Sequence, residues 1–464
     1  MRRYTINLKY NRLYFIIASV AFAIAIYLFG ADVKENYEWL FMLPLVSAFS
    51  FITLCIFNVS YKHNIGVLCV IGLSFVRFTI HPALLHFGNY AHAFAVNVEE
   101  KARNAIWLMV FELVAITITL IVTNSKSFKS RVVATRHFVK RKWLRNCLLF
   151  LTVFCIVTFI VFPSTRGMFN NILHLSDYDF TVVTYKTTEN AAGSLVRIMQ
   201  TLCGMFFHFI RILVPVYVIY NKSKSGASEI KLYMWALLFS VLQFFFITST
   251  FAESIISAAV VLLVTVHLCP NFGNRFLSIS VVAVLSVFLI FFGVRFTVKY
   301  TYTGIESVFQ YISFIVNAYF TGVVNVAGIF YVPAEFKSSA LFFDLYGAIP
   351  FNTTLFGLSG QKLQSYFNLY TGGYGQIVPS IAAGYYYFGG LFAPFFSCLF
   401  TFCAVKYGKK ADRTTYAWRY VAYIFLAMMF SLGISMYSPA IVFSWYTTWG
   451  LPMHILATFS DEKM

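Results

Sequence analysis

The feature that most constrains this chain is a series of apolar stretches of about 20 residues, each long enough to cross a bilayer as a helix. Hydrophobic residues make up 59% of the chain and charged residues 11%. A soluble domain averages roughly 45–50% apolar residues and about 25% charged residues. A water-soluble enzyme, a disordered chain and a collagen-like chain are therefore excluded. About twelve stretches qualify, at residues 13–30, 39–58, 65–86, 105–123, 147–163, 198–220, 232–249, 252–269, 277–296, 377–405, 416–436 and 439–458.

These stretches predict an all-α polytopic membrane protein with about 12 transmembrane helices, built as a single integral membrane domain over residues 1–464. The first stretch is long and lacks a small-residue cleavage site, so we expect a retained span and not a signal peptide. The eight cysteines are scattered and form no CxxC pair. We therefore expect neither a disulfide framework nor a metal site.

The distribution of basic residues predicts the orientation in the membrane. If the N-terminus is cytoplasmic, 23 Lys and Arg residues lie inside, nine lie outside, and Arg77, Arg211 and Arg295 lie within spans. Cytoplasmic loops are enriched in Lys and Arg, so we expect both termini to lie in the cytoplasm. We expect the protein to lie in the plasma (inner) membrane. The same rule accounts for the net charge of +18 without any nucleic-acid partner.

One predicted extracytoplasmic loop, at about residues 297–376, is much longer than the others. It contains the apolar piece QYISFIVNAYFTGVVNVAGIFYV and the amphipathic piece 339–351. We expect both to form short helices in or against the outer membrane interface. Loops this long are usually functional. No internal repeat is visible, although many secondary transporters are built from repeated halves.

Ionisable residues inside a membrane span are costly and are candidates for function. The sixth stretch carries six polar or small residues at spacings of 4, 3, 4, 3 and 4, which place them on one helical face: Arg197, Thr201, Gly204, His208, Arg211 and Pro215. We expect this face to line a cavity that opens to the outside. The alternative is an arginine that extends to the membrane interface, which fits Arg197 but not Arg211 near mid-span.

Further cations are predicted near the outer leaflet. Arg77 and His81 share a face of the third stretch, Arg295 and Lys299 lie one turn apart at the end of the ninth, and Arg166 opens an outer loop. Guanidinium groups bind phosphate oxygens in a bidentate manner, so we expect Arg77, Arg211 and Arg295 to face one outer cavity and bind a diphosphate. The alternative is that some arginines pair with acids such as Glu253 or Glu306.

Glu112 is an isolated carboxylate in the fourth stretch. Paired with Arg77 or Arg211 it would be structural, and near an acceptor hydroxyl it could be a general base. Both readings stay open. As the base we expect Glu112 in preference to His208, which is deeper and one turn from Arg211.

The segment 371–390 holds six glycines and a proline, which predicts irregular backbone at membrane depth. Such backbone is tolerated only against protein or a water-filled cavity. Tyr374, Gln376, Ser380 and residues 385–387 could bind a sugar through stacking and hydrogen bonds. Close helix packing through small residues is the alternative.

Several of these segments resemble the bacterial oligosaccharide repeat-unit polymerase family, which contains the Wzy-type O-antigen and capsular polysaccharide polymerases. The resemblance rests on 77-RFTIHPALL, 107-WLMVFELVA, 318-AYFTGVVNVA and 375-GQIVPSIAAGYYYFGGLFAP, and on the span pattern with one dominant late outer loop. Some members carry, in an outer loop, an Arg followed eleven residues later by Gly. No Arg in the predicted outer loops here has that spacing, so no catalytic arginine is transferred.

The resemblance implies a GT-C-like, metal-independent membrane glycosyltransferase without a cofactor. It would move a growing chain from its undecaprenyl diphosphate carrier to an incoming undecaprenyl-diphosphate-linked oligosaccharide at the outer face. The implied partners are this lipid-linked substrate, the bilayer, and the chain-length regulator and flippase of the same pathway. Arginines would stabilise the departing diphosphate, with Arg211 and either Glu112 or His208 as the catalytic residues.

Two other classes of protein fit part of the pattern. A lipid-linked oligosaccharide flippase or another transporter would also need many spans and a cationic cavity. A membrane-bound acyltransferase would need a catalytic histidine, for which the predicted outer side offers His81, His86, His92 and His174. No HxxxD-like signature surrounds these histidines.

Overall fold

The computed structural model describes residues 9–29, 34–59, 64–92, 94–124, 142–162, 165, 194–243, 251–268, 308–349, 352, 362–373 and 376–461. Over these ranges the protein is helical and contains no strand, which confirms the predicted all-α class. Five helices are long and apolar enough to cross a membrane, judged by length and composition: Ile65–Phe87, Val98–Asn124, Trp143–Val161, Ile198–Lys224 and Ala417–Ser435. Shorter apolar helices accompany them, and the twelve-span count stays a prediction.

The helices follow the predicted stretches closely in the first half of the chain. They are α1 (Lys9–Leu28), α2 (Met42–Ile56), α3 (Ile65–Phe75), η2 (Val76–Ile80), α4 (His81–Phe87), α5 (Ala102–Asn124), α6 (Lys142–Val161), α8 (Ser194–Lys224), α9 (Glu229–Leu242) and α10 (Phe251–Leu268). The predicted span 277–296 lies outside the described residues.

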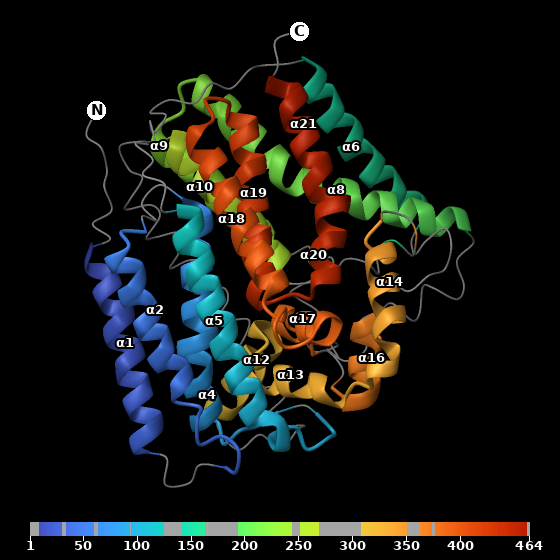
Figure 1. Ribbon diagram of the computed structural model, residues 1–464. Helices are drawn as coiled ribbons and strands as arrows, with labels where there is room; N and C mark the ends of the chain where they lie inside the picture. Colours follow the sequence, from blue (N-terminus) through green and yellow to red (C-terminus); the bar gives the residue numbers. More distant parts are fainter. Residues whose placement is uncertain are drawn as a thin grey trace.

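The second half of the chain is more broken. Its main helices are α12 (Val308–Phe320), α13 (Val323–Gly328), α14 (Lys337–Gly347), α16 (Lys362–Thr371), α17 (Ser380–Phe388), α18 (Phe395–Arg413), α19 (Ala417–Ser435), α20 (Pro439–Trp445), η8 (Tyr446–Gly450) and α21 (Leu451–Asp461). Figure 1 shows α19 at the centre of the main bundle, where it packs against α18, α3, α21 and α10.

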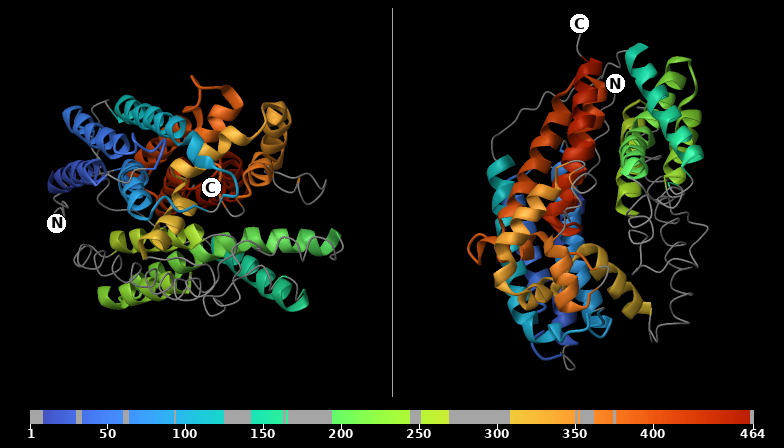
Figure 2. Two further views of the ribbon diagram at one scale, coloured as in Figure 1. Left: turned by 90° about the horizontal axis from the view of Figure 1, so that it is seen from below. Right: turned by 90° about the vertical axis from the view of Figure 1, so that its right-hand side faces the viewer.

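The helices form two layers. Figure 2 shows α6, α8, α9 and α10 as a layer of their own along one side of the main bundle. α8 is strongly inclined to the axis of that bundle (Figures 1 and 2). Contacts of α10 with α19 and of α8 with η8 join the two layers, and His208, on the predicted polar face of α8, contacts Trp449 of η8 at this junction.

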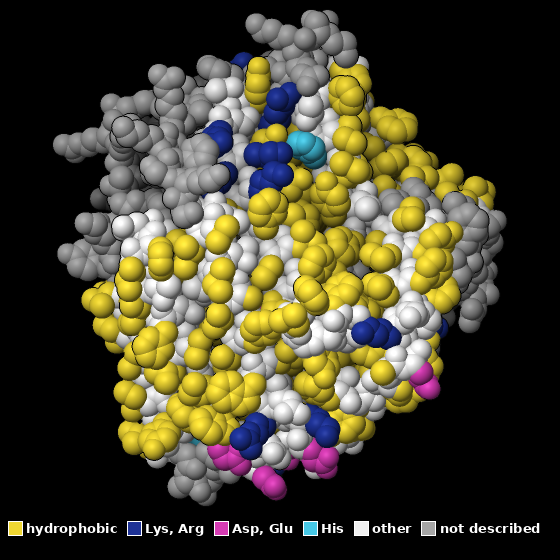
Figure 3. Space-filling view, in the orientation of Figure 1, with side chains coloured by type: hydrophobic (Ala, Val, Ile, Leu, Met, Phe, Trp, Pro, Cys, Tyr) yellow, Lys and Arg dark blue, Asp and Glu magenta, His cyan; other side chains and the backbone are white. Residues whose placement is uncertain are grey.

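Side-chain types separate along the bundle axis. Figure 3 shows a broad apolar band, a group of Lys and Arg without Asp or Glu in the upper part of the view, and Asp and Glu together with further Lys and Arg at the lower end. Helices along the edge of the bundle expose large apolar side chains, such as Phe150 and Ile160 on α6. Exposed apolar surface of this extent is typical of a lipid-facing protein.

Two π-helical segments interrupt the bundle, and each ends two residues before a proline. η2 precedes Pro82, and η8 precedes Pro452. A proline has no N–H for the carbonyl four residues earlier and its ring crowds that carbonyl, so a wider turn relieves the strain. The sequence predicts a kink or an end at Pro82. In the structure the chain instead stays helical up to Pro82 through the π-turn of η2, which carries Arg77. The second π-turn, η8, carries Trp449.

The region predicted as the long outer loop is only partly as expected. α14 is the expected amphipathic helix, with Phe342 and Leu345 exposed and Asp344 buried. The earlier apolar piece is divided into α12 and α13 at Thr321, whose φ of 41° is left-handed. All residues of α13 are buried, against α5, so α13 is not the interfacial helix that we expected. Its one polar side chain, Asn325, is also buried and is hydrogen-bonded to Asn317 and to the Ile377 carbonyl.

The predicted span 377–405 is two helices. Gly389 ends α17 with a φ of 82°, and Pro394 precedes α18. Before α17, residues 376–379 are also non-helical. The irregular backbone that the glycine-rich segment predicts is therefore present. Residues 376–379 are held against protein, whereas residues 390–392 are exposed.

Candidate functional site

Most of the predicted site residues that the structure describes fall into two buried polar clusters. We call the first the Arg77 cluster (Arg77, His81, Glu112, Asn317, Thr321, Asn325, Gln376, Ser380 and Ser397). We call the second the His208 cluster (His208, Arg211, Gln243, Glu253, Ser254 and Trp449). The two clusters have different partners and are carried by different helices.

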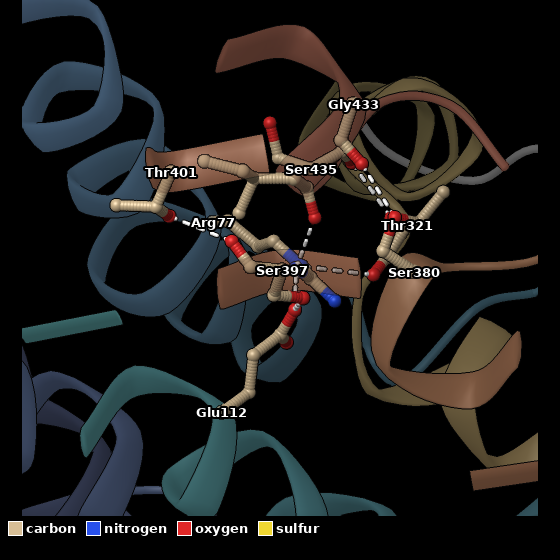
Figure 4. Close-up of polar contacts among 9 residues, drawn as sticks. Arg77, Glu112, Thr321, Ser380, Ser397, Thr401, Gly433 and Ser435 are labelled. Atoms are coloured by element: carbon tan, nitrogen blue, oxygen red, sulfur yellow. Dashed lines mark hydrogen bonds and ion pairs between the residues drawn. The ribbon is translucent and has the colours of Figure 1, made fainter. Parts of the chain in front are cut away.

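The centre of the Arg77 cluster is an ion pair between two side chains with no exposed surface. Arg77 Nη1 lies 3.0 Å from Glu112 Oε1, and both side chains are 0% exposed. Ser397 on α18 donates to the same carboxylate oxygen at 2.5 Å. Glu112 is therefore an arginine's partner, one of the two readings that the sequence leaves open (Figure 4).

The same cluster satisfies the carbonyl groups at the end of α19. Ser380 Oγ donates to Gly433 O at 2.6 Å, Arg77 Nη1 to Ile434 O at 2.7 Å, and Thr321 Oγ1 to Ser435 O at 2.6 Å (Figure 4). The last carbonyls of a helix have no partner within it, and a cation near them is favourable. This helix end is buried in the protein, so the cluster has a clear structural task.

His81 extends the cluster toward a group of amides. Its ring lies directly against Gly322, where a Cβ atom would come within 1.8 Å of the imidazole. Next to it, Asn317 Nδ2 donates to Asn325 Oδ1 at 2.6 Å, and Asn325 Nδ2 donates to Ile377 O at 3.0 Å. These groups are buried too, so Arg77, His81, Gln376 and Ser380 come together but line no open cavity.

The His208 cluster forms where α8, α9 and α10 meet. His208 and Arg211 are 7% and 5% exposed and lie one turn apart on α8. Glu253, in the first turn of α10, places Oε2 3.8 Å from His208 Nε2 and 3.8 Å from Arg211 Nη1. The Glu253 carboxylate therefore faces both the His208 imidazole and the Arg211 guanidinium.

Hydrogen bonds fix the guanidinium of Arg211. Its Nε donates to Gln243 Oε1 at 3.0 Å, and its Nη2 donates to Ser254 Oγ at 2.9 Å. Gln243 Nε2 donates back to the Arg211 carbonyl at 2.7 Å. Gln243 follows the end of α9 and Ser254 lies at the start of α10, so the orientation of Arg211 depends on the packing of α9 and α10 against α8.

Two tryptophan rings that belong to the main bundle cover one side of the His208 cluster. The Trp449 indole lies against His208 with ring centroids 3.7 Å apart and the planes tilted by 30°, and Trp445 stacks on Trp449 at 5.1 Å. The π-turn of η8 therefore positions a tryptophan against the candidate base. Segments of this kind recur at functional sites.

The arrangement corrects one prediction and leaves others open. Arg77 and Arg211 do not face one shared cavity, because each reaches a carboxylate on a neighbouring helix, Glu112 and Glu253 respectively. Arg197 lies on α8, but its side chain is outside the described part of the structure. The remaining candidates lie outside the described residues altogether: Arg166, Arg295, Lys299 and Tyr374.

A pocket of about 380 Å³, including the part open to solvent, lies between α14, α16, α17 and α20. Its polar wall includes Asp344, which accepts hydrogen bonds from Tyr387 Oη and from the backbone N–H groups of Lys362 and Leu363. Burial raises the pKa of the Asp344 carboxyl, although these hydrogen bonds oppose the rise. The bonds tie α14 to the start of α16 and to α17.

Within the described ranges, no group of three His, Cys, Asp or Glu side chains could hold a metal ion. No protein-family model, curated protein or solved structure matches this chain.

Proposed function

We propose that the protein is a membrane glycosyltransferase that joins undecaprenyl-diphosphate-linked oligosaccharide repeat units at the outer face of the plasma membrane. The observation that carries this proposal is the His208 cluster, in which a histidine, an arginine and a carboxylate lie within 3.8 Å contacts inside an apolar bundle. Transfer from a lipid diphosphate needs a base for the acceptor hydroxyl and a cation for the departing diphosphate.

Each side chain has a role in the proposed reaction. The acceptor hydroxyl oxygen attacks the anomeric carbon of the growing chain, and the bond from that carbon to the diphosphate oxygen breaks. His208 takes the hydroxyl proton, and Glu253 beside its Nε2 stabilises the imidazolium that forms. Arg211, held by Gln243 and Ser254, stabilises the negative charge on the diphosphate that leaves with its lipid.

We assign the base to His208 in place of Glu112. Glu112 has no exposed surface, and its Oε1 is bound by Arg77 and Ser397, so a sugar hydroxyl could reach this carboxylate only if the surrounding helices moved apart. His208 lies at a junction between the two layers of helices, on the face of α8 that carries Arg211. The cytoplasmic location of both termini belongs to the same proposal, and it is supported by the excess of Lys and Arg in the predicted inner loops.

The test is deletion of the gene in its own host, followed by gel separation of the surface glycan. The proposal predicts single repeat units in place of a ladder of polymer lengths. The His208→Gln variant at normal abundance should give the same pattern, whereas Lys222→Gln, an exposed change on the same helix, should restore the ladder. Loss of all surface glycan would support a flippase, and an unchanged ladder would reject both.

A further inference from the structure

The segment that carries Trp449 is held in place by contacts with α14 and α19. Trp449 lies in η8, at the junction of α20 and α21, and α8 passes beside this junction (Figure 1). Thr447 Oγ1 donates a hydrogen bond to the carbonyl of Ala348, which caps the end of α14. A Cβ on Gly450 would lie 2.7 Å from Leu426 Cδ2, so η8 also packs closely on α19. The main bundle therefore fixes the position of the Trp449 ring.

Both faces of the Trp449 indole are covered by other rings. The centroid of the His208 ring is 3.7 Å away with the planes tilted by 30°, and the centroid of the Trp445 ring is 5.1 Å away with the planes tilted by 29°. Two nearly parallel rings at these distances would overlap if they lay on the same face of the indole, so they occupy opposite faces. No face is left on which a sugar could stack, and Trp449 acts on the site through its contact with His208.

His208 has one partner at the edge of its ring and another at the face. At the edge, Glu253 Oε2 lies 3.8 Å from Nε2. In the proposed reaction the imidazole becomes a cation inside an apolar bundle. The face of an indole attracts a cation through the quadrupole of its π-electrons, and the attraction is larger where water is excluded. Van der Waals contact with the indole also restricts the orientation of the imidazole.

We propose that Trp449 is a positioning residue of the proposed glycosyl transfer. It holds the His208 ring in the orientation that accepts the hydroxyl proton, and it stabilises the imidazolium that forms. The inference rests on the proposed function, because it assigns Trp449 a role through the base of that reaction. It differs from a purely structural role, since loss of the indole should slow the transfer step and leave substrate binding unchanged.

The test is the rate of chain extension by the purified full-length protein in lipid vesicles, measured over a range of concentrations of its host's undecaprenyl-diphosphate-linked repeat unit. In Trp449→Leu, kcat should fall at least about tenfold, the effect of losing one desolvated cation–π contact. KM should stay within about twofold of the wild-type value. Trp449→Phe keeps an aromatic face and should recover most of the lost rate. Trp143→Leu removes an exposed tryptophan at the start of α6 and is the matched control, with both constants unchanged.

Wild-type kcat in a folded Trp449→Leu protein would overturn the inference and leave the proposed function intact. The same conclusion follows if Trp449→Phe is as slow as Trp449→Leu, or if KM rises while kcat is unchanged, because Trp449 would then support the fold or substrate binding and not the base. A wild-type protein that forms no product would instead reject the proposed function, and the inference with it. If Trp449→Leu does not fold, as judged by thermal unfolding in detergent, Trp449→Met is measured in its place with the same outcomes.

Discussion

At the scale of single residues, the buried arginines divide into one with a structural task and one with a proposed chemical task. Arg77 joins Glu112 to the carbonyl end of α19, whereas Arg211 lies beside a histidine. The helical spacing of α8 already placed His208 and Arg211 on one face. It could not identify Glu253 as their shared partner, because periodicity gives the face of a helix but not the helix that packs against it. Trp449 was missed for the same reason.

The structural reading of Arg77 predicts the outcome of breaking its ion pair. Arg77→Met leaves a buried carboxylate unpaired and should cost about 3–5 kcal/mol of stability, seen as loss of protein or a lower unfolding temperature in detergent. Arg77→Met combined with Glu112→Leu removes both charges and should recover much of that loss. A stable Glu112→Gln protein that makes no polymer would contradict this reading and return Glu112 to the chemistry.

At the scale of elements, the apolar stretches located most helices but not the breaks inside them. The glycine-rich segment predicted irregular backbone, which is present around α17. The burial of α13 could not be predicted, since its apolar sequence fits lipid and protein equally well. Close contacts between helices are also invisible in the sequence: a Cβ on Gly66 of α3 would lie 2.0 Å from the Ala404 carbonyl of α18.

This contact predicts different effects for two glycines of the same helix. Gly66→Ala forces α3 away from α18 and should cost about 1–3 kcal/mol. Gly72→Ala is the control, because a Cβ there meets nothing within 4 Å and should be neutral or stabilising by up to about 1 kcal/mol. Thermal unfolding of both variants in detergent measures the difference. Equal unfolding temperatures would mean that α3 and α18 are not packed as described.

At the scale of the whole molecule, the distribution of Lys and Arg along the sequence predicts the orientation in the membrane, with α14 outside and the turn between α18 and α19 inside. Ser338 on α14 and Thr415 between α18 and α19 are both exposed. With native cysteines replaced, an impermeant maleimide should label Ser338→Cys but not Thr415→Cys in intact cells. Labelling of Thr415→Cys alone would invert the orientation and move the proposed chemistry to the cytoplasm.

The central claim is that the His208 cluster performs glycosyl transfer, and reconstitution tests it most directly. The purified protein in lipid vesicles is given its host's undecaprenyl-diphosphate-linked repeat unit, and the products are separated by length. The wild type and Lys222→Gln should form a ladder. Arg211→Lys keeps the charge but loses the planar fork, so its rate should fall at least about tenfold, as expected when roughly 1.4 kcal/mol of transition-state stabilisation is lost. His208→Gln should form no ladder. Wild-type rates and chain lengths from folded Arg211→Lys and His208→Gln proteins would contradict the account.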